Sequence, residues 1–395
     1  MKTLIELYDE RTIENVIGPE VFRPQKVIYL CPEEVAADRG IRENLKSFLR
    51  SRGLEISVEF VAVSLFKADR VLAQLRRIAA ENQDCAMDVT GGTDAALIAA
   101  GMFCRETNIP TFTYSRKRNR FYNISNAPFA EDYPCTLSYD VEEFFAMAGG
   151  KMREGRVDNS LLDRYLDGFE AFFQVFLKYR SSWNDQILFL QRISQGHKDA
   201  PVSLKVSGSW IQKGERGGRI AVEPEFLKSL EQIGYLKDLQ LTEEERVAFT
   251  FESEAVRNWL RDVGSVLELY IYKACKDAGI FHDVVSSAIV DWDGTNTRGS
   301  VSNEIDAVAA RGIVPIFISC KACDVKTEAL NELSILAERF GGKGAKAAIA
   351  TTEPLTASAR HRAAQLGIAV IDLEELQAGK AAERLKVIMK VQESL

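Results

Sequence analysis

The chain has 395 residues, of which 46% are hydrophobic and 27% are charged, and its formal net charge is −7. This composition is typical of a globular protein, and the length predicts two or three domains. A negative net charge gives no global signal for nucleic-acid binding, so such binding would need a local basic patch.

The cysteines and the apolar runs indicate where the protein works. The seven cysteines are scattered and odd in number, which favours a reduced cytoplasmic protein over a disulfide framework. No apolar run approaches the roughly 20 residues that cross a bilayer, and the N-terminus turns acidic at once, unlike a signal peptide. We therefore expect no membrane partner.

Residues 1 to about 125 alternate apolar runs with helical patterns. Strands are predicted over 3–8, 26–31, 57–63, 85–89 and 111–114, and helices over 43–52, 68–80 and 94–105. This alternation predicts an α/β fold with a mostly parallel sheet covered by helices on both faces. Such folds bind ligands beyond the carboxyl ends of their strands.

One strand end carries the sequence D-V-T-G-G-T-D, residues 88–94, and opens a helix. Gly91 and Gly92 would let the backbone approach a phosphate, and the free amides of a helix N-terminus favour an anion. Thr90 and Thr93 add hydroxyl donors. The plainer interpretation is a strand-to-helix turn with Thr93 or the following aspartate as N-cap. The spacing is neither a Walker loop nor G-x-G-x-x-G, so it does not indicate ATP or NAD.

The next part of the chain is less informative. The basic cluster S-R-K-R-N-R, residues 115–120, is interpreted as a solvated hairpin turn rather than a ligand contact. One amphipathic helix is predicted over 161–179, and its aromatic stripe indicates core or a dimer face. The basic stretch 196–218, around Trp210, is interpreted as a surface loop, with nucleic-acid contact as the alternative.

From about residue 263 the predicted order is helix, three strands, helix, strand, helix, strand, which indicates a mixed sheet flanked by helices. Two apolar runs within 303–321 meet at Arg311-Gly312, which predicts a two-residue hairpin turn there. The resulting pairs are Asp306 with Phe317 and Glu304 with Ser319. Because side chains alternate along strands, four polar residues then share one face: Glu304, Asp306, Ser319 and Lys321.

Two carboxylates, a hydroxyl and an amine on one face suit a divalent cation with a nearby proton-handling lysine. A one-residue error in the turn would move one strand's side chains to the other face. Glu268, three residues after Ser265, also fits a capping box at the start of a helix. The C-x-x-C at Cys320 and Cys323 lacks the second pair that a closed zinc site needs, which leaves a redox role as an alternative.

With these residues in view, the C-terminal part resembles the PD-(D/E)xK nuclease superfamily. Leu267-Glu268 matches its helix, Asp306 its metal-binding acid on the second strand, and Ser319-Cys320-Lys321 its acid-x-lysine. Ser319 stands where many relatives carry an acid, and Glu304 offers a carboxylate nearby.

The N-terminal part with D-V-T-G-G-T is similar to a CARF domain, the Rossmann-like sensor of cyclic oligoadenylates. The pair in this order resembles the CARF nuclease effectors of type III CRISPR systems. The resemblance implies a CARF domain over 1–145, a connecting helical and β region over 146–262, and a nuclease domain over 263–395. It also implies a homodimer that binds one ring, commonly cyclic tetra-adenylate. The implied pocket residues are Tyr8, Asp9, Thr90, Gly91, Gly92 and Thr93.

The resemblance further implies a metal-dependent endonuclease with Mn²⁺ or Mg²⁺ that cuts single-stranded DNA or RNA, or nicks duplex DNA. Asp306 would bind the cation by its carboxylate, Cys320 by its backbone carbonyl, and Glu268 through water. Lys321 would position or deprotonate the attacking water. Two alternatives remain: an ungated repair or restriction nuclease, and a nuclease-dead ligand-sensing regulator, which the serine at position 319 favours.

Overall fold

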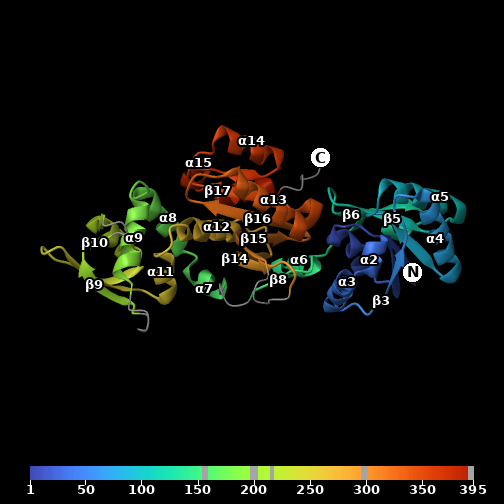
Figure 1. The fold of residues 1–395 in the computed structure, drawn as a ribbon, viewed down its shortest axis with the longest axis horizontal. Helices are drawn as coiled ribbons and strands as arrows, with labels where there is room; N and C mark the ends of the chain where they lie inside the picture. Colours follow the sequence, from blue (N-terminus) through green and yellow to red (C-terminus); the bar gives the residue numbers. More distant parts are fainter. Residues whose placement is uncertain (154–158, 196–202, 214–217, 295–300, 390–395) are drawn as a thin grey trace.

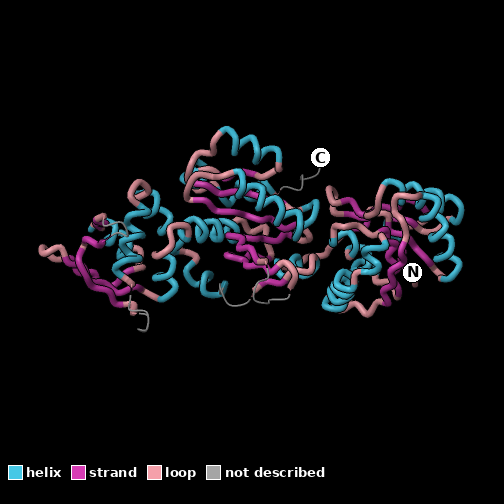
Figure 2. Tube along the Cα trace, viewed as in Figure 1, coloured by secondary structure: helices cyan, strands magenta, loops and turns pink. Residues whose placement is uncertain are grey.

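The computed structural model describes residues 1–153, 159–195, 203–213, 218–294 and 301–389. The molecule is elongated, and the order of its parts in space differs from their order in the chain (Figure 1). The N-terminal unit lies at one end and the C-terminal unit in the centre, with the middle segment, residues 168–262, at the other end. Figure 2 shows the strands of these parts as separate groups along the long axis.

The N-terminal unit is built on a seven-stranded sheet of order β3-β2-β1-β4-β5-β6-β7. Its first five strands run parallel, and β6 and β7 are added through antiparallel pairs. The strands are β1 Thr3–Leu7, β2 Lys26–Cys31, β3 Ser57–Ala62, β4 Cys85–Asp88, β5 Thr111–Ser115, β6 Arg120–Ser125 and β7 Tyr133–Pro134. The mostly parallel α/β sheet that the alternation predicts is therefore confirmed.

Successive residues of the central strand β1 enter different cores, as a strand covered on both faces requires. Leu4 packs with residues of α3 (Arg39–Ser51), and Ile5 packs with residues of α4 (Ala68–Glu81) and α5 (Asp94–Thr107). The remaining short helices of this unit are η1 Thr12–Asn15, α1 Ile17–Phe22, α2 Glu33–Ala37, η2 Pro128–Ala130 and α6 Val141–Met147.

The C-terminal unit contains a six-stranded mixed sheet of order β18-β17-β16-β15-β14-β8. Its strands are β14 Asp283–Asp291, β15 Ser302–Arg311, β16 Val314–Lys321, β17 Lys346–Thr351 and β18 Ala369–Ile371, joined by β8 Lys151–Met152 from earlier in the chain. Its helices are α12 Ser265–Asp277, α13 Thr327–Gly341, η3 Gly342–Gly344, α14 Ala357–Gln365, α15 Leu373–Gln377 and α16 Ala381–Ile388. The mixed sheet flanked by helices is confirmed.

The middle segment and its approach contain α7 Asn159–Tyr165, α8 Gly168–Lys178, α9 Trp183–Ile193, α10 Pro224–Gln232 and α11 Glu254–Trp259, with strands β9 Lys205–Ser209, β10 Ile211–Lys213, β11 Arg219–Ala221, β12 Leu236–Leu241 and β13 Arg246–Phe251. The prediction of a single helix over 161–179 is wrong, because α7 ends at Tyr165 and α8 starts at Gly168. Its aromatic stripe is buried core, and Phe173 stacks on Tyr270 of α12 with ring centroids 4.0 Å apart.

One predicted segment is only partly covered by the structure. Of the basic stretch 196–218, residues 196–202 and 214–217 lie outside the described residues. In the described part of the chain, no helix is long and apolar enough to cross a membrane.

Candidate active site and ligand-binding loop

The β15–β16 hairpin turns at Gly312-Ile313, one residue later than the sequence predicts. Gly312 has φ +57°, a left-handed conformation that glycine adopts without a Cβ penalty. Ala310 pairs with Pro315 and Val308 with Phe317, so the predicted pairing of Asp306 with Phe317 and of Glu304 with Ser319 is wrong. The register differs from the predicted one by two residues, which preserves the face of every side chain.

The paired part of this hairpin ends at Ala307 and Ile318, just before the polar residues. The carboxylate of Asp306 then takes the place of a strand partner and accepts from the backbone N–H of Cys320 at 2.6 Å. The same oxygen, Oδ2, accepts from the Ser319 hydroxyl at 3.1 Å and lies 3.6 Å from Nζ of Lys321. Asp306, Ser319 and Lys321 therefore converge where the two strands separate.

The neighbouring strand is distorted at the same level. The β14–β15 ladder pairs Ser286 with Ala307 and Ala288 with Ile305, but it skips Ser287 and Asp306. Ser287 has φ +50°, a backbone conformation that costs free energy for a residue other than glycine. Residues in such conformations are concentrated at functional sites. The hydroxyl of Ser286 donates to the backbone carbonyl of Asp306 at 3.4 Å. Nothing in the sequence pattern of this apolar strand indicates such a break.

Glu268 belongs to the same electrostatic environment. The capping box predicted for it does not form, because α12 is capped by Gly264 without a side-chain hydrogen bond. Burial first, and then the charges of Asp306, Asp262 and Glu304, raise the pKa of Glu268 to about 8, against a lowering effect of Lys321. Glu268 also lines a cavity whose wall includes Ser286 and Ser287 of β14, the strand that pairs with β15.

A small cavity of about 60 Å³ brings the hairpin residues together with helix α13. It is lined by all four side chains that the alternation groups on one face, Glu304, Asp306, Ser319 and Lys321, and by Glu332 of α13. Sequence reasoning missed Glu332, because its approach depends on how α13 packs on the sheet. Its carboxylate accepts a hydrogen bond from the side-chain amide of Asn303.

The donor chemistry of this region fits a hard divalent cation, which prefers carboxylate and carbonyl oxygens. The charges of Asp306, Asp262 and Glu304 add to the burial that raises the pKa of Glu268, and a bound cation would offset them. Within the described ranges, no three histidine, cysteine, aspartate or glutamate side chains already form a metal-binding group. Cys320 is buried and Cys323 exposed, and neither forms a disulfide.

The glycine loop packs against the end of β1. A Cβ on Gly91 would lie 2.6 Å from the carbonyl oxygen of Leu7 and 3.0 Å from the Cβ of Asp9. Gly92 has φ +95°, and a Cβ there would lie 2.9 Å from the Cβ of Leu7. The two glycines are therefore required for the close approach that brings this loop beside Tyr8 and Asp9.

The threonine hydroxyls of the loop already have protein partners. Thr93 is the N-cap of α5, accepting from the Ala96 amide at 3.3 Å, and its hydroxyl also bonds the carbonyl of Leu65. The Thr90 hydroxyl accepts from the Tyr114 amide at 2.8 Å and bonds the carboxylate of Asp88. The N-cap interpretation of Thr93 is thus correct, and backbone amides remain the donors that a ligand could use.

Tyr8 and Asp9 differ in accessibility. Tyr8 is buried, and burial followed by nearby acidic groups raises the pKa of its hydroxyl to about 12. Asp9 is partly exposed, and its backbone is held by Asn15 of η1, which accepts from the Asp9 amide at 2.9 Å and donates to its carbonyl at 2.7 Å.

No family model matches the sequence, and no curated protein matches it. Protein VC1899 from Vibrio cholerae has a TM-score of 0.71 to this chain at 16% identity, with 97% of each chain covered. Can2 from Sulfobacillus thermosulfidooxidans, solved in complex with cyclic tetra-adenylate, has a TM-score of 0.69 at 18% identity, covering 98% of this chain and 99% of that one. This chain therefore has the fold of these two proteins along almost its whole length.

A third structure, a type III CRISPR defence DNA nuclease activated by cyclic oligoadenylate, has a TM-score of 0.47 at 14% identity, with 95% of this chain and 51% of that chain covered. The fold that the sequence resemblance implies is confirmed by the first two structures.

Proposed function

We propose that this protein is a metal-dependent endonuclease that a cyclic oligoadenylate activates, in type III CRISPR defence. The observation that carries the proposal is the convergence of Asp306, Ser319 and Lys321 at the separated end of the hairpin. These residues lie in a chain with the fold of Can2, a protein known in complex with cyclic tetra-adenylate.

In this proposal Asp306 holds a Mg²⁺ or Mn²⁺ ion by its carboxylate, with the backbone carbonyl of Cys320, and Glu268 acts through water. The cation would lower the pKa of water and stabilise the charge that develops on the scissile phosphate. Lys321, 3.6 Å from Asp306, positions the water or removes its proton and offsets phosphate charge. Ser319 fixes the orientation of the Asp306 carboxylate by its hydrogen bond.

The proposed sensor is a homodimer formed through α5. This helix exposes Leu97, Ile98 and Met102, the last two with 62% and 49% of their surface accessible. Ile98 and Met102 share one side of the helix, because positions one turn apart lie above one another, and Leu97 borders this side. Since α5 begins directly after the glycine loop, a two-fold axis along this side would bring two copies of the loop together. Such a pair suits one ring of matching two-fold symmetry.

The decisive experiment is a cleavage assay on plasmid and on single-stranded DNA and RNA, with and without cyclic tetra-adenylate. Asp306→Ala and Lys321→Ala should each abolish cutting, while calorimetry shows unchanged ring binding. Glu383→Ala, which removes an exposed carboxylate from the same unit, serves as the matched control and should cut normally. Cutting by a cleanly purified Asp306→Ala protein would remove the assignment.

The same assay separates the two alternatives. Cleavage that every ring leaves unchanged would favour an ungated repair or restriction nuclease. Ring binding without cleavage of any substrate, in either metal, would favour a regulator that senses the ligand but does not cut. The serine at position 319, where an acid is common in similar nucleases, is the feature on which that second alternative depends.

A further inference from the structure

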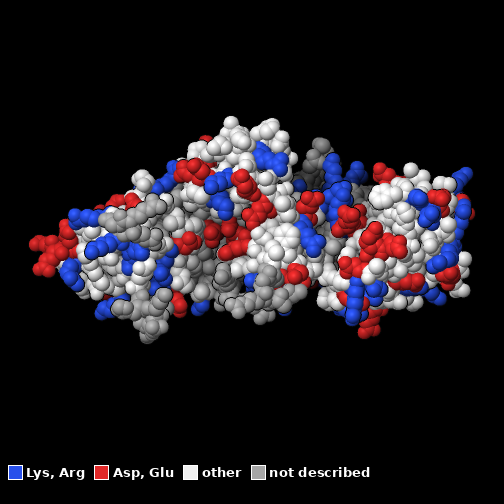
Figure 3. Space-filling view, viewed as in Figure 1, with Lys and Arg blue, Asp and Glu red and all other residues white. Residues whose placement is uncertain are grey.

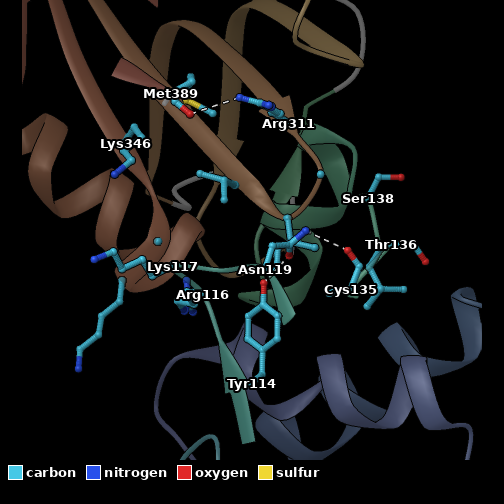
Figure 4. A pocket seen from close by; sticks show the side chains of 16 residues that line it. Tyr114, Arg116, Lys117, Asn119, Cys135, Thr136, Ser138, Arg311, Lys346 and Met389 are labelled. Carbon is cyan, nitrogen blue, oxygen red and sulfur yellow. Dashed lines mark hydrogen bonds between the residues drawn. The ribbon is translucent and has the colours of Figure 1, made fainter. Parts of the chain in front are cut away.

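A cavity of about 750 Å³ lies where the N-terminal and C-terminal units meet, apart from both sites described above (Figure 4). From the N-terminal unit it is lined by the β5–β6 turn and by residues 135–138. From the C-terminal unit it is lined by the β15–β16 turn, by η3, by the start of β17 and by Met389, directly after α16. A ligand in this cavity would therefore contact both units.

The lining of this junction cavity is strongly basic. Among the described residues that line it, there is no aspartate or glutamate, and five are cationic: Arg116, Lys117, Arg311, Lys343 and Lys346. Figure 3 shows lysine and arginine side chains gathered where the two units meet. Within the described part of the chain, none of the three lysines forms an ion pair, whereas Arg116 is held by the buried Glu14. Such a concentration of positive charge favours an anion.

The rest of the wall is apolar. This apolar part of the wall is formed by Tyr114, Leu137, Ile313, Val314 and Met389. The volume lies within the roughly 300–1,000 Å³ typical of small-molecule sites, which combine an apolar wall with a few polar anchors. Lysine and arginine side chains bind phosphates, and an apolar wall accepts the faces of a base and a sugar. A nucleotide matches both properties, and this size favours it over a nucleic-acid strand.

The cavity is connected to the glycine loop by two short chains of hydrogen bonds. Tyr114 donates its amide to the Thr90 hydroxyl at 2.8 Å. On the other side, Nε of Arg116 donates to Glu14 of η1 at 2.9 Å, and the next residue, Asn15, holds the backbone of Asp9. The lining residues of the junction cavity thus contact the elements that position the candidate ring pocket.

We propose that the junction cavity binds a nucleotide with at least two phosphate groups, and that this ligand couples the sensor to the nuclease. The coupling rests on the proposed function, but the binding does not. A ligand that bridges the two units can shift their arrangement only by binding one arrangement more tightly. By linkage, the nucleotide and the ring would then change each other's affinity by the same factor.

The test is calorimetry on the full chain in metal-free buffer, with ADP as the probe and inorganic pyrophosphate in parallel. We expect one ADP per chain, with affinity roughly tenfold or more weaker in Lys343→Glu/Lys346→Glu, because two charge-assisted phosphate contacts are lost. Lys205→Glu/Lys380→Glu has the same change in net charge at exposed positions elsewhere and should bind ADP normally.

Three results would overturn the proposal. The first is equal ADP affinity in the two double variants. The second is complete displacement of ADP by cyclic tetra-adenylate at a single shared site. The third is that a 20-nucleotide single strand, but not ADP, loses affinity in Lys343→Glu/Lys346→Glu, which would assign the cavity to the substrate strand. A milder variant, Lys343→Gln/Lys346→Gln, should show a smaller loss in the same direction. Because these readouts measure binding alone, they stand even if no nuclease activity is found.

Discussion

The buried acids below the glycine loop give a sharp prediction about stability and pH. Glu6 at the end of β1 and Asp88 at the end of β4 are both buried, on neighbouring parallel strands. A Cβ on Gly18 would lie 2.8 Å from an oxygen of Glu6 and 2.5 Å from an oxygen of Asp88, so α1 closes over both. Burial raises the pKa of Asp88 from 3.8 to about 7, although two hydrogen bonds from Thr90 oppose the shift.

The direction of the pH effect follows from this raised pKa. The folded state holds the proton of Asp88 more tightly than the unfolded state does. The contribution of Asp88 to folding stability is therefore highest below about pH 4. As pH rises from about 4 to about 7, the free energy of unfolding of the N-terminal unit should fall by up to about 4 kcal/mol, since each pKa unit corresponds to 1.36 kcal/mol. Above pH 7 this contribution should level off. Burial and Asp88 also raise the pKa of Glu6, which extends the loss to higher pH.

The measurement is hydrogen exchange in the full chain, followed in peptides of β1 and β4 between pH 5 and 8 and corrected for intrinsic exchange rates. This local readout is needed because none of the four tryptophans lies in the N-terminal unit. Asp88→Asn should reduce the pH dependence, and Glu6→Gln/Asp88→Asn should nearly remove it. If the unaltered chain instead gained protection as pH rises over this range, the reasoning about the buried pair would be refuted.

Three further predictions concern single side chains. Ile98→Glu, on the exposed side of α5, should convert a dimer to a monomer in analytical ultracentrifugation and weaken ring binding; a monomeric unaltered protein would contradict this. Gly91→Ala should abolish ring binding in calorimetry, because its Cβ would meet a backbone oxygen of β1 at 2.6 Å. Phe173→Ala should cost about 3–5 kcal/mol in urea unfolding followed by tryptophan fluorescence, whereas Ile335→Ala, at an exposed position, should cost less than about 0.5 kcal/mol.

Much of the fold is predictable from local signals. The five strands predicted in the N-terminal unit, β1 to β5, fall within one residue of their predicted ranges, because apolar runs, helical periodicity and the glycine loop agree there. No ranges are predicted for β6 and β7. The hairpin turn is misplaced by one residue, since Gly312 is compatible with the first as well as the second turn position. The candidate site is still grouped correctly, because a shift of two residues leaves each side chain on its face.

The features that the sequence does not predict depend on contacts between distant segments. Ser287 has a positive φ where the β14–β15 ladder skips Ser287 and Asp306, and no residue type there indicates it. Glu332 reaches the site only through the packing of α13 on the sheet. The predicted 161–179 helix is split between Tyr165 and Gly168, and Phe173 of the second helix stacks on Tyr270 of α12. Single-sequence patterns report periodicity along one segment and say little about such approaches.

The short strand β8 affects how the C-terminal unit could be isolated. Lys151 and Met152 pair with β14 and form the outermost strand of the six-stranded sheet, more than 100 residues before the rest of it. A recombinant fragment that starts at residue 263 would leave the β14 edge bare, and bare edges recruit other chains into aggregates. It would also lose α8, so that Tyr270 would face water. Expression of the fragment 263–395 by itself should therefore give insoluble material, unless residues 141–193 are supplied with it.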